Sequence, residues 1–357
     1  MINVRLSLQS RNGSAFGWPR RSCIMPELRQ DLFKNSWVVI ATDVELKPRD
    51  FPINRSGAQH AIANAFCPFC EGQEATTPPE LASYRQEGTA ADTPGWQVRT
   101  VPNKYSAFNP EGSFAPQMDG IFTRADGFGQ HEVIVETPRH DVDFHELPEE
   151  HIELVFKMLR QRYNALAEDK RMKYLQIYKN RGLFAGASLS HSHSQMVGLP
   201  MVPETCRIMS RYYEENHACL MCKVLEEERA QGKRIVWESD YFTILCPYAS
   251  RYSYETWIVP RRHTEHYGEI TDQEISDLAV VVKRLLTVLM DKLENASYNI
   301  VFNTAPINVA YQPGHHWNME ITPRLIVTNG VEMGTGYHVN PVSPEIAARV
   351  IREKLGE

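Results

Sequence analysis

Two stretches of the chain share one plan: residues 133–140 read Val-Ile-Val-Glu-Thr-Pro-Arg-His, and residues 257–263 read Trp-Ile-Val-Pro-Arg-Arg-His. Each is a short apolar run that ends in a histidine, and the two histidines, His140 and His263, are 123 positions apart. Short apolar runs bounded by proline and charged residues are typical of buried strands. The two stretches therefore predict equivalent strands in a duplicated unit.

The similarity continues on the C-terminal side of both strands. Residues 147–166 and 271–289 carry apolar side chains at helical spacing, and the second segment opens with a capping box from Thr271 to Glu274. Strand-like segments follow at 174–178 and 298–302, and histidine-containing segments at 191–195 and 316–320. We therefore expect an α+β fold of two tandem units, each an antiparallel sheet with packed helices.

The expected boundaries follow from where the two repeats begin and end. We assign residues 26–202 to an N-terminal unit and residues 203–357 to a C-terminal unit. Residues 1–25 contain arginines but no acidic residue, and they have no compact apolar run of the kind found in a secretory signal. We interpret them as an N-terminal extension that is disordered.

Composition and charge exclude several classes of protein. The 357 residues include 38 Lys and Arg against 44 Asp and Glu, a formal charge of −6. Binding a nucleic-acid backbone needs clustered positive charge, so we expect no nucleic-acid partner. No apolar run approaches the roughly 18 residues of a membrane span, so we expect no membrane partner.

The cysteines predict metal sites. Four of the seven cysteines form two Cys-x-x-Cys pairs. Because the chain is long and has few cysteines, we expect thiolates in a reducing cytoplasm and not a disulfide framework. A structural zinc ion takes four thiolate or imidazole ligands. Each pair can be completed by two histidines at matching repeat positions, which predicts one or two structural zinc ions, with the ligand sets Cys67, Cys70, His140 and His191, and Cys219, Cys222, His263 and His316.

The alternative for each Cys-x-x-Cys is a redox pair, which should begin a helix that follows a strand. Four further histidines lie near the chosen ones in sequence, and we interpret them as surface or core side chains: His131, His145, His266 and His315.

The segment with the clearest chemistry is residues 186–195, which read Gly-Ala-Ser-Leu-Ser-His-Ser-His-Ser-Gln. In a strand, His191, His193 and Gln195 share one face. A fixed neutral imidazole at His193 can attack phosphorus or act as a general base, and Gln195 and Ser188 can donate to phosphoryl oxygens. The second repeat has Asn318 in place of His193, which restricts catalysis to the N-terminal unit. A second metal ligand or a buried, hydrogen-bonded histidine remains the alternative for His193.

Together, His-x-His-x-Gln at 191–195, the duplicated unit, the Cys-x-x-Cys pairs and Val-Pro-Asn-Lys-Tyr at 101–105 resemble the galactose-1-phosphate uridylyltransferase family of the histidine-triad superfamily. The resemblance implies a homodimer and a ping-pong reaction through a nucleotidyl-histidine at His193. It also implies that Asn103 and Asn180 contact nucleotide or phosphate, and that Glu332 binds sugar hydroxyls. Lys47 stands where the family often has a phosphate-binding arginine.

Within this resemblance, the first reading is exchange of UMP between UDP-glucose and galactose 1-phosphate. Ser192, where many members have proline, and the cysteine-rich second metal site look more like the branch with ADP-glucose phosphorylase, which transfers adenylyl from ADP-glucose to phosphate. Two alternatives come from other classes. One is a non-enzymatic zinc-ribbon binding protein. The other is a nucleotide hydrolase. Gln195 argues against it, because hydrolase relatives carry a third histidine at this position.

Overall fold

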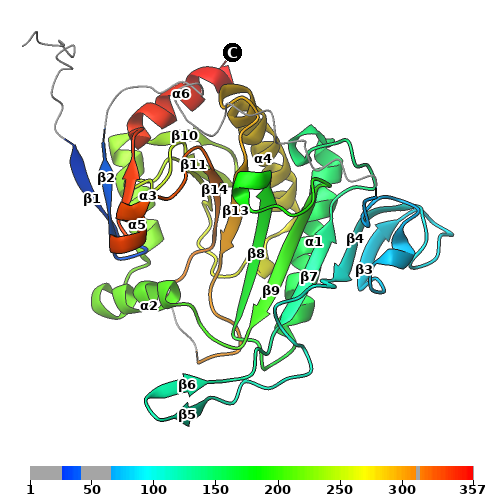
Figure 1. Cartoon of the computed structure of the whole chain (residues 1–357). Coiled ribbons are helices and arrows are strands. Elements are labelled where there is room, and N and C mark those ends of the chain that lie inside the picture. Colours follow the sequence, from blue (N-terminus) through cyan, green and yellow to red (C-terminus); the bar gives the residue numbers. More distant parts are fainter. Residues whose placement is uncertain (1–25, 42–65, 311–313, 357) are drawn as a thin grey trace, which may run out of the picture.

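The computed structural model describes residues 26–41, 66–310 and 314–356. Its main feature is an antiparallel sheet of ten strands that crosses the whole molecule (Figure 1). In spatial order these strands are β10 (Ile235–Glu238), β11 (Phe242–Leu245), β12 (Thr256–Pro260), β14 (Asn318–Pro323), β13 (Tyr298–Asn303), β8 (Tyr174–Arg181), β9 (His193–Leu199), β7 (Gln130–Val135), β4 (Trp96–Pro102) and β3 (Ala82–Arg85).

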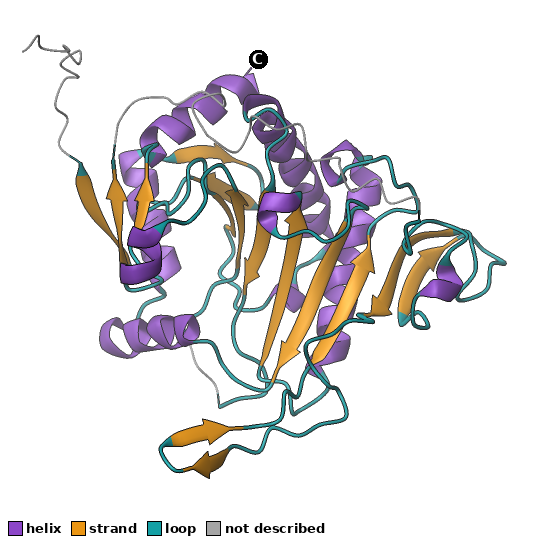
Figure 2. Ribbon diagram, in the orientation of Figure 1, coloured by secondary structure: helices purple, strands orange, loops and turns teal. Residues whose placement is uncertain are grey.

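Two long helices cover one face of this sheet (Figure 2). They are α1 (Glu149–Ala167) and α4 (Asp272–Lys292), and each buries a stripe of apolar side chains in the main core. Helix α4 begins at the predicted capping box, in which Thr271 accepts from the Glu274 backbone and the Glu274 side chain accepts from the Thr271 backbone. The other α-helices of the described residues are α2 (Glu204–Asn216), α3 (Leu220–Gln231), α5 (Gly330–Thr335) and α6 (Pro344–Gly356).

The α+β class and the duplicated strand–helix–strand plan are confirmed. The equivalent elements β7 and β12, α1 and α4, β8 and β13, and β9 and β14 follow one another in the predicted order. The sheet differs from the expectation: the two units were expected to have a sheet each, but their strands form one continuous sheet. Strands β8 and β13 pair in antiparallel fashion, with Tyr298 opposite Arg181 and Val301 opposite Tyr178. This pairing joins the two half-sheets and satisfies backbone groups that would otherwise form exposed edges.

Smaller elements lie outside the main sheet. Strands β1 (Glu27–Asp31), β2 (Ser36–Ile40) and β15 (His338–Asn340) form a three-stranded sheet, so the N-terminal strands of the described chain pair with a strand near its C-terminal end. Strands β5 (Gln117–Asp119) and β6 (Phe122–Arg124) form a projecting hairpin (Figure 1). The predicted extension at 1–25 and the candidate phosphate contact Lys47 lie outside the described residues.

Among the described residues, no helix is both long enough and apolar enough to cross a membrane.

Candidate active site

Strand β9 holds two of the candidate catalytic residues, His193 and Gln195, in the N-terminal half of the sheet, and Ser188 lies in the loop before it. It lies between β7 and β8, with His193 opposite Val135 and Gln195 opposite both Val133 and Tyr178. Because side chains alternate along a strand, His193 and Gln195 point to the face away from α1, while Ser194 and Met196 point toward it. The side chains predicted to act together therefore lie on the uncovered face of the sheet.

A cavity of about 650 Å³ opens on that face. Four of the predicted site residues line it: Ser188, His193, Gln195 and Asn103. Much of the remaining lining is apolar or aromatic and comes from the loop around the first Cys-x-x-Cys and from the end of β4, including Phe66, Pro68, Phe69, Val101 and Pro102. A mainly apolar cavity with a few convergent polar groups is the usual form of a small-molecule site.

The imidazole of His193 is held in one tautomer. Its Nδ1 lies 2.7 Å from the His191 carbonyl oxygen, which can only accept, so Nδ1 carries the proton. The ring is buried, and its centroid lies 5.4 Å from the centroid of the Phe69 ring, with the two planes inclined at 60°. Burial lowers the pKa of His193, which favours the neutral ring. The other nitrogen, Nε2, then carries a lone pair and has no hydrogen-bond partner in the described chain, as a nucleophile requires.

A buried polar cluster lies under the catalytic strand, on the side that faces α1. Glu136 accepts hydrogen bonds from Ser192 and Ser194, both at 2.5 Å, and from Lys179 Nζ at 2.6 Å. Lys179 also donates to the His193 carbonyl oxygen at 3.1 Å. The cluster fixes the backbone of β9 where His193 emerges. No motif in the sequence points to Glu136 or Lys179, although the serines that alternate with His191, His193 and Gln195 indicate polar partners on the opposite face of the strand.

Removing the cation from this cluster is expected to destabilise the protein strongly. Lys179 and Glu136 are 3% and 0% exposed, so Lys179→Met leaves a carboxylate buried with only two hydroxyl donors. Breaking a buried ion pair costs about 3–5 kcal/mol of unfolding free energy. Urea unfolding should show this loss, and the double variant Lys179→Met/Glu136→Leu should recover a large part of it. An unchanged free energy of unfolding in the single variant would contradict this expectation, because the Glu136 carboxylate would then be satisfied without Lys179.

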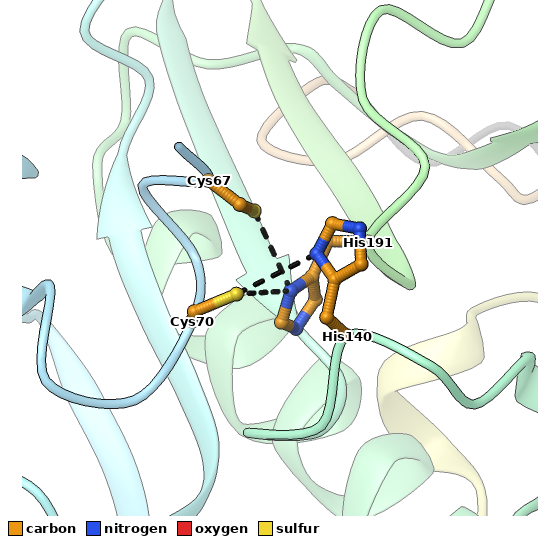
Figure 3. Close-up of side chains that lie close together, drawn as sticks. All are labelled: Cys67, Cys70, His140 and His191. Atoms are coloured by element: carbon orange, nitrogen blue, oxygen red, sulfur yellow. Dashed lines mark hydrogen bonds between the residues drawn. The ribbon is translucent and has the colours of Figure 1, made fainter. Parts of the chain in front are cut away.

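The first predicted metal cluster is assembled around the loop at residues 67–70 (Figure 3). Cys67 Sγ lies 3.6 Å from His191 Nδ1, and Cys70 Sγ lies 3.5 Å from His140 Nδ1 and 3.7 Å from His191 Nδ1. Zinc bonds of about 2.3 Å to sulfur and 2.0–2.1 Å to nitrogen, at tetrahedral angles, place these atoms about 3.6 Å apart. The four donors therefore fit a tetrahedral ion.

The second predicted cluster repeats this arrangement in the C-terminal half. Cys219, Cys222, His263 and His316 have all their donor atoms within 4.8 Å of one another. In both clusters the remaining nitrogen of the buried histidine donates to a backbone carbonyl, from His191 to Thr137 at 2.7 Å and from His316 to Pro260 at 2.9 Å. Such outer contacts orient imidazole ligands.

The redox reading of the Cys-x-x-Cys pairs fits less well. The first pair lies in a turn-rich loop, and the second begins α3 but follows helix α2 rather than a strand. All four cysteines are free, and Cys70 and Cys222 face imidazole nitrogens. Burial raises the pKa of Cys70 to about 11, so a nearby cation is needed to keep that sulfur as a thiolate at neutral pH.

Two predicted substrate contacts lie apart from the cavity. Asn180 is on β8, two residues beyond Tyr178, and its side-chain oxygen accepts from Asn299 Nδ2 at 2.8 Å. Glu332 caps its own short helix, α5, by accepting from the Asn329 backbone at 3.0 Å, and it lines a different, small cavity. Within one chain, the structure therefore does not bring Glu332 to His193.

The fold and the site together define a class of protein: a duplicated α+β enzyme that presents a neutral histidine to a small-molecule cavity. The chain belongs to the galactose-1-phosphate uridyl transferase family, whose N-terminal domain model matches residues 28–203 and whose C-terminal domain model matches residues 205–342.

Relatives of two activities resemble the chain over nearly its whole length. It is 34% identical to ADP-glucose phosphorylase of Arabidopsis thaliana, covering 92% of this chain and 93% of that protein. It is 30% identical to galactose-1-phosphate uridylyltransferase of Thermotoga maritima, covering 92% and 98%. The crystal structure of the Arabidopsis phosphorylase with bound ADP-glucose matches with a TM-score of 0.75 and 32% identity, over 92% of this chain and 99% of that one. The chain is thus a member of a family of nucleotidyl-transferring enzymes.

Proposed function

We propose that the protein transfers a nucleoside monophosphate from a nucleotide sugar to a phosphate acceptor through a covalent intermediate on His193. The observation that carries the proposal is the His193 ring, whose Nδ1 is tied to the His191 carbonyl while Nε2 is left at a cavity shared with Ser188 and Gln195. The family membership supports the same chemistry.

In the first half-reaction, His193 Nε2 attacks the α-phosphorus of the nucleotide sugar. A phosphorus–nitrogen bond forms, the bond from the α-phosphorus to the bridging oxygen breaks, and the sugar 1-phosphate leaves with that electron pair. The ring becomes positively charged, and the Nδ1–H bond to the His191 carbonyl at 2.7 Å strengthens as it does so. Gln195 and Ser188 are placed to donate to the phosphoryl oxygens.

In the second half-reaction, an oxygen of the acceptor phosphate attacks the same phosphorus. The phosphorus–nitrogen bond breaks, and its electron pair returns to Nε2, so the neutral imidazole is restored. One cavity serves both steps, since the acceptor enters where the sugar 1-phosphate left. The C-terminal half has Asn318 at the start of β14, the position that corresponds to His193 at the start of β9. We therefore propose a catalytic unit at 26–202 and a degenerate unit at 203–357.

Two donors are candidates, as the relatives have both activities. ADP-glucose with inorganic phosphate as acceptor is favoured by the identity and structural likeness to the Arabidopsis phosphorylase. UDP-glucose with galactose 1-phosphate is supported by the Thermotoga uridylyltransferase. The mechanism at His193 is the same for both.

Two residue sets would hold zinc, namely Cys67, Cys70, His140 and His191, and Cys219, Cys222, His263 and His316. With four protein ligands an ion has no open position, so zinc would stabilise the fold and take no part in the reaction. The free thiols fit the reducing cytoplasm that we propose as the compartment. A homodimer remains a prediction, and the exposed apolar side chains of Met118, Ile121 and Phe122 on the β5–β6 hairpin are compatible with one.

The test uses donors labelled in the α-phosphate, without an acceptor. The protein is incubated with ADP-glucose or with UDP-glucose, quenched in base and analysed for label on His193. We expect label from one donor, released by phosphate in the first case or by galactose 1-phosphate in the second. Steady release of free nucleotide without an acceptor would instead indicate a hydrolase. A folded, zinc-loaded protein that takes no label from either donor would contradict the proposal and favour a non-enzymatic role.

A further inference from the structure

The carboxamide of Gln195 is held from behind by two side chains that do not line the cavity. Its oxygen Oε1 lies 2.9 Å from His131 Nε2 and 3.0 Å from the Tyr178 hydroxyl, which donates to it. We propose that His131 and Tyr178 are positioning residues that keep the carboxamide oxygen of Gln195 turned away from the cavity and its nitrogen turned toward the phosphoryl group. The inference rests on the proposed function. It gives a role to His131, which the sequence predicts only as a core or surface side chain, and to Tyr178, which is expected only as part of the strand at 174–178.

A chain of contacts that begins at a backbone group settles the orientation. The Tyr105 backbone N–H donates to Asn103 Oδ1 at 2.9 Å, so the Asn103 amide nitrogen must be the end that faces His131. That nitrogen lies 3.4 Å from His131 Nδ1, which then accepts. Because a neutral imidazole carries one proton, Nε2 bears it and donates to Gln195.

The opposite tautomer leaves the cluster unsatisfied. With the proton on Nδ1, the single lone pair of Nε2 would face three groups at once: the Asn103 amide at 3.2 Å, the Tyr178 hydroxyl at 3.4 Å and the Gln195 carboxamide at 2.9 Å. The proton on Nδ1 would find no acceptor among the described residues. The partly buried ring favours the arrangement in which its own N–H has an acceptor, which is Gln195 Oε1.

The fixed orientation has a chemical consequence at the phosphorus. With Oε1 engaged by two donors, only the N–H groups of Gln195 are left for a ligand, and these stabilise negative phosphoryl oxygens. A rotated carboxamide would present its oxygen instead and repel them. Neither His131 nor Tyr178 lines the cavity, so both act through Gln195. Because the Gln195 carboxamide oxygen already accepts from His131 and Tyr178, it is not left to accept a hydrogen bond from water.

A double-mutant cycle separates positioning from a general structural role. The variants are Tyr178→Phe and His131→Ala, each alone and combined with Gln195→Ala, with single-turnover transfer rate and donor affinity as the two measurements. Gln195→Ala should slow transfer about 100-fold or more. Each positioning variant should slow it about 5-fold, the worth of one hydrogen bond, with donor affinity within twofold. In the Gln195→Ala background, neither should have a further effect.

Tyr174→Phe is the matched control, since it removes a hydroxyl from the same face of β8, away from Gln195, and should leave the rate unchanged. Equal losses with and without the Gln195 carboxamide would overturn the proposal, as would full activity in both positioning variants. Thermal midpoints confirm that all variants are folded.

The tautomer gives a readout that does not depend on activity. In protein with ¹⁵N-labelled histidine, long-range nitrogen–proton spectra should show His131 protonated at Nε2, with the signal assigned by its loss in His131→Ala. A proton on Nδ1 would overturn the inference even if transfer is normal. If the spectra show Nε2–H but the wild-type protein takes no label from either donor, the proposed function fails while the assigned orientation holds, so the two failures are distinct.

Discussion

Replacing His193 by asparagine is expected to abolish both half-reactions and to leave the fold intact. The substitution copies the C-terminal half, where Asn318 occupies the equivalent position. An asparagine amide nitrogen has no available lone pair to attack phosphorus, so no covalent intermediate can form. Losing a nucleophile that acts as part of a unit lowers kcat by a factor on the order of 10⁶. The measurement is turnover with donor and acceptor together, combined with the α-phosphate labelling of the protein.

The matched control is His217→Asn. His217 caps α2 with a left-handed backbone, a conformation that asparagine tolerates, and it is exposed and does not line the cavity at His193. This variant should keep wild-type turnover and labelling. A His193→Asn protein that still transfers within tenfold of wild type would refute the nucleophile assignment, and a label found on another residue would show which group replaces it.

The sequence predicts those features of the fold that depend on local pattern or on repetition. The helical stripe from Ile152 to Leu166 predicts α1, and the capping box at Thr271 predicts where α4 begins. The ligand sets of both clusters could be named because an identical Cys-x-x-Cys spacing recurs with two histidines at matching repeat positions. Because the unit is repeated, each ligand position can be checked against the equivalent position in the other repeat, which is not possible for a single motif.

The features that the sequence does not predict are long-range pairings. Nothing local in residues 174–181 shows that β8 pairs with β13 rather than forming an edge, and the three-stranded sheet joins β2 to β15 across about 300 residues. Side-chain networks are equally hidden, since Glu136, Lys179 and Ser192 meet only when three elements are assembled. Glu332 was predicted as a substrate contact from the resemblance alone. Within one chain, it lies at a different cavity from the one at His193.

Disrupting the two metal clusters separately is expected to have different consequences. In Cys67→Ser and Cys219→Ser, a buried sulfur of each proposed zinc site is replaced at matching positions of the two Cys-x-x-Cys pairs. Each protein should lose one zinc ion per chain, measured by atomic emission, and each should unfold at a lower temperature. Structural zinc contributes roughly 10–16 kcal/mol in small zinc peptides. We expect a smaller loss of unfolding free energy in this chain, because its large apolar core also stabilises the fold.

Only Cys67→Ser is expected to lower transfer strongly, because its cluster is connected to the catalytic strand. His191 belongs to the first cluster, and its carbonyl oxygen accepts from His193 Nδ1 at 2.7 Å. When His191 is released, the hydrogen bond that fixes the His193 tautomer loosens, and the nucleophile loses its orientation. In the second cluster, His316 is followed by Trp317 and Asn318, which cannot act as a nucleophile, so Cys219→Ser should affect stability far more than the rate of the folded fraction. Equal losses of rate per folded molecule in the two variants would show that the first cluster has no special connection to His193.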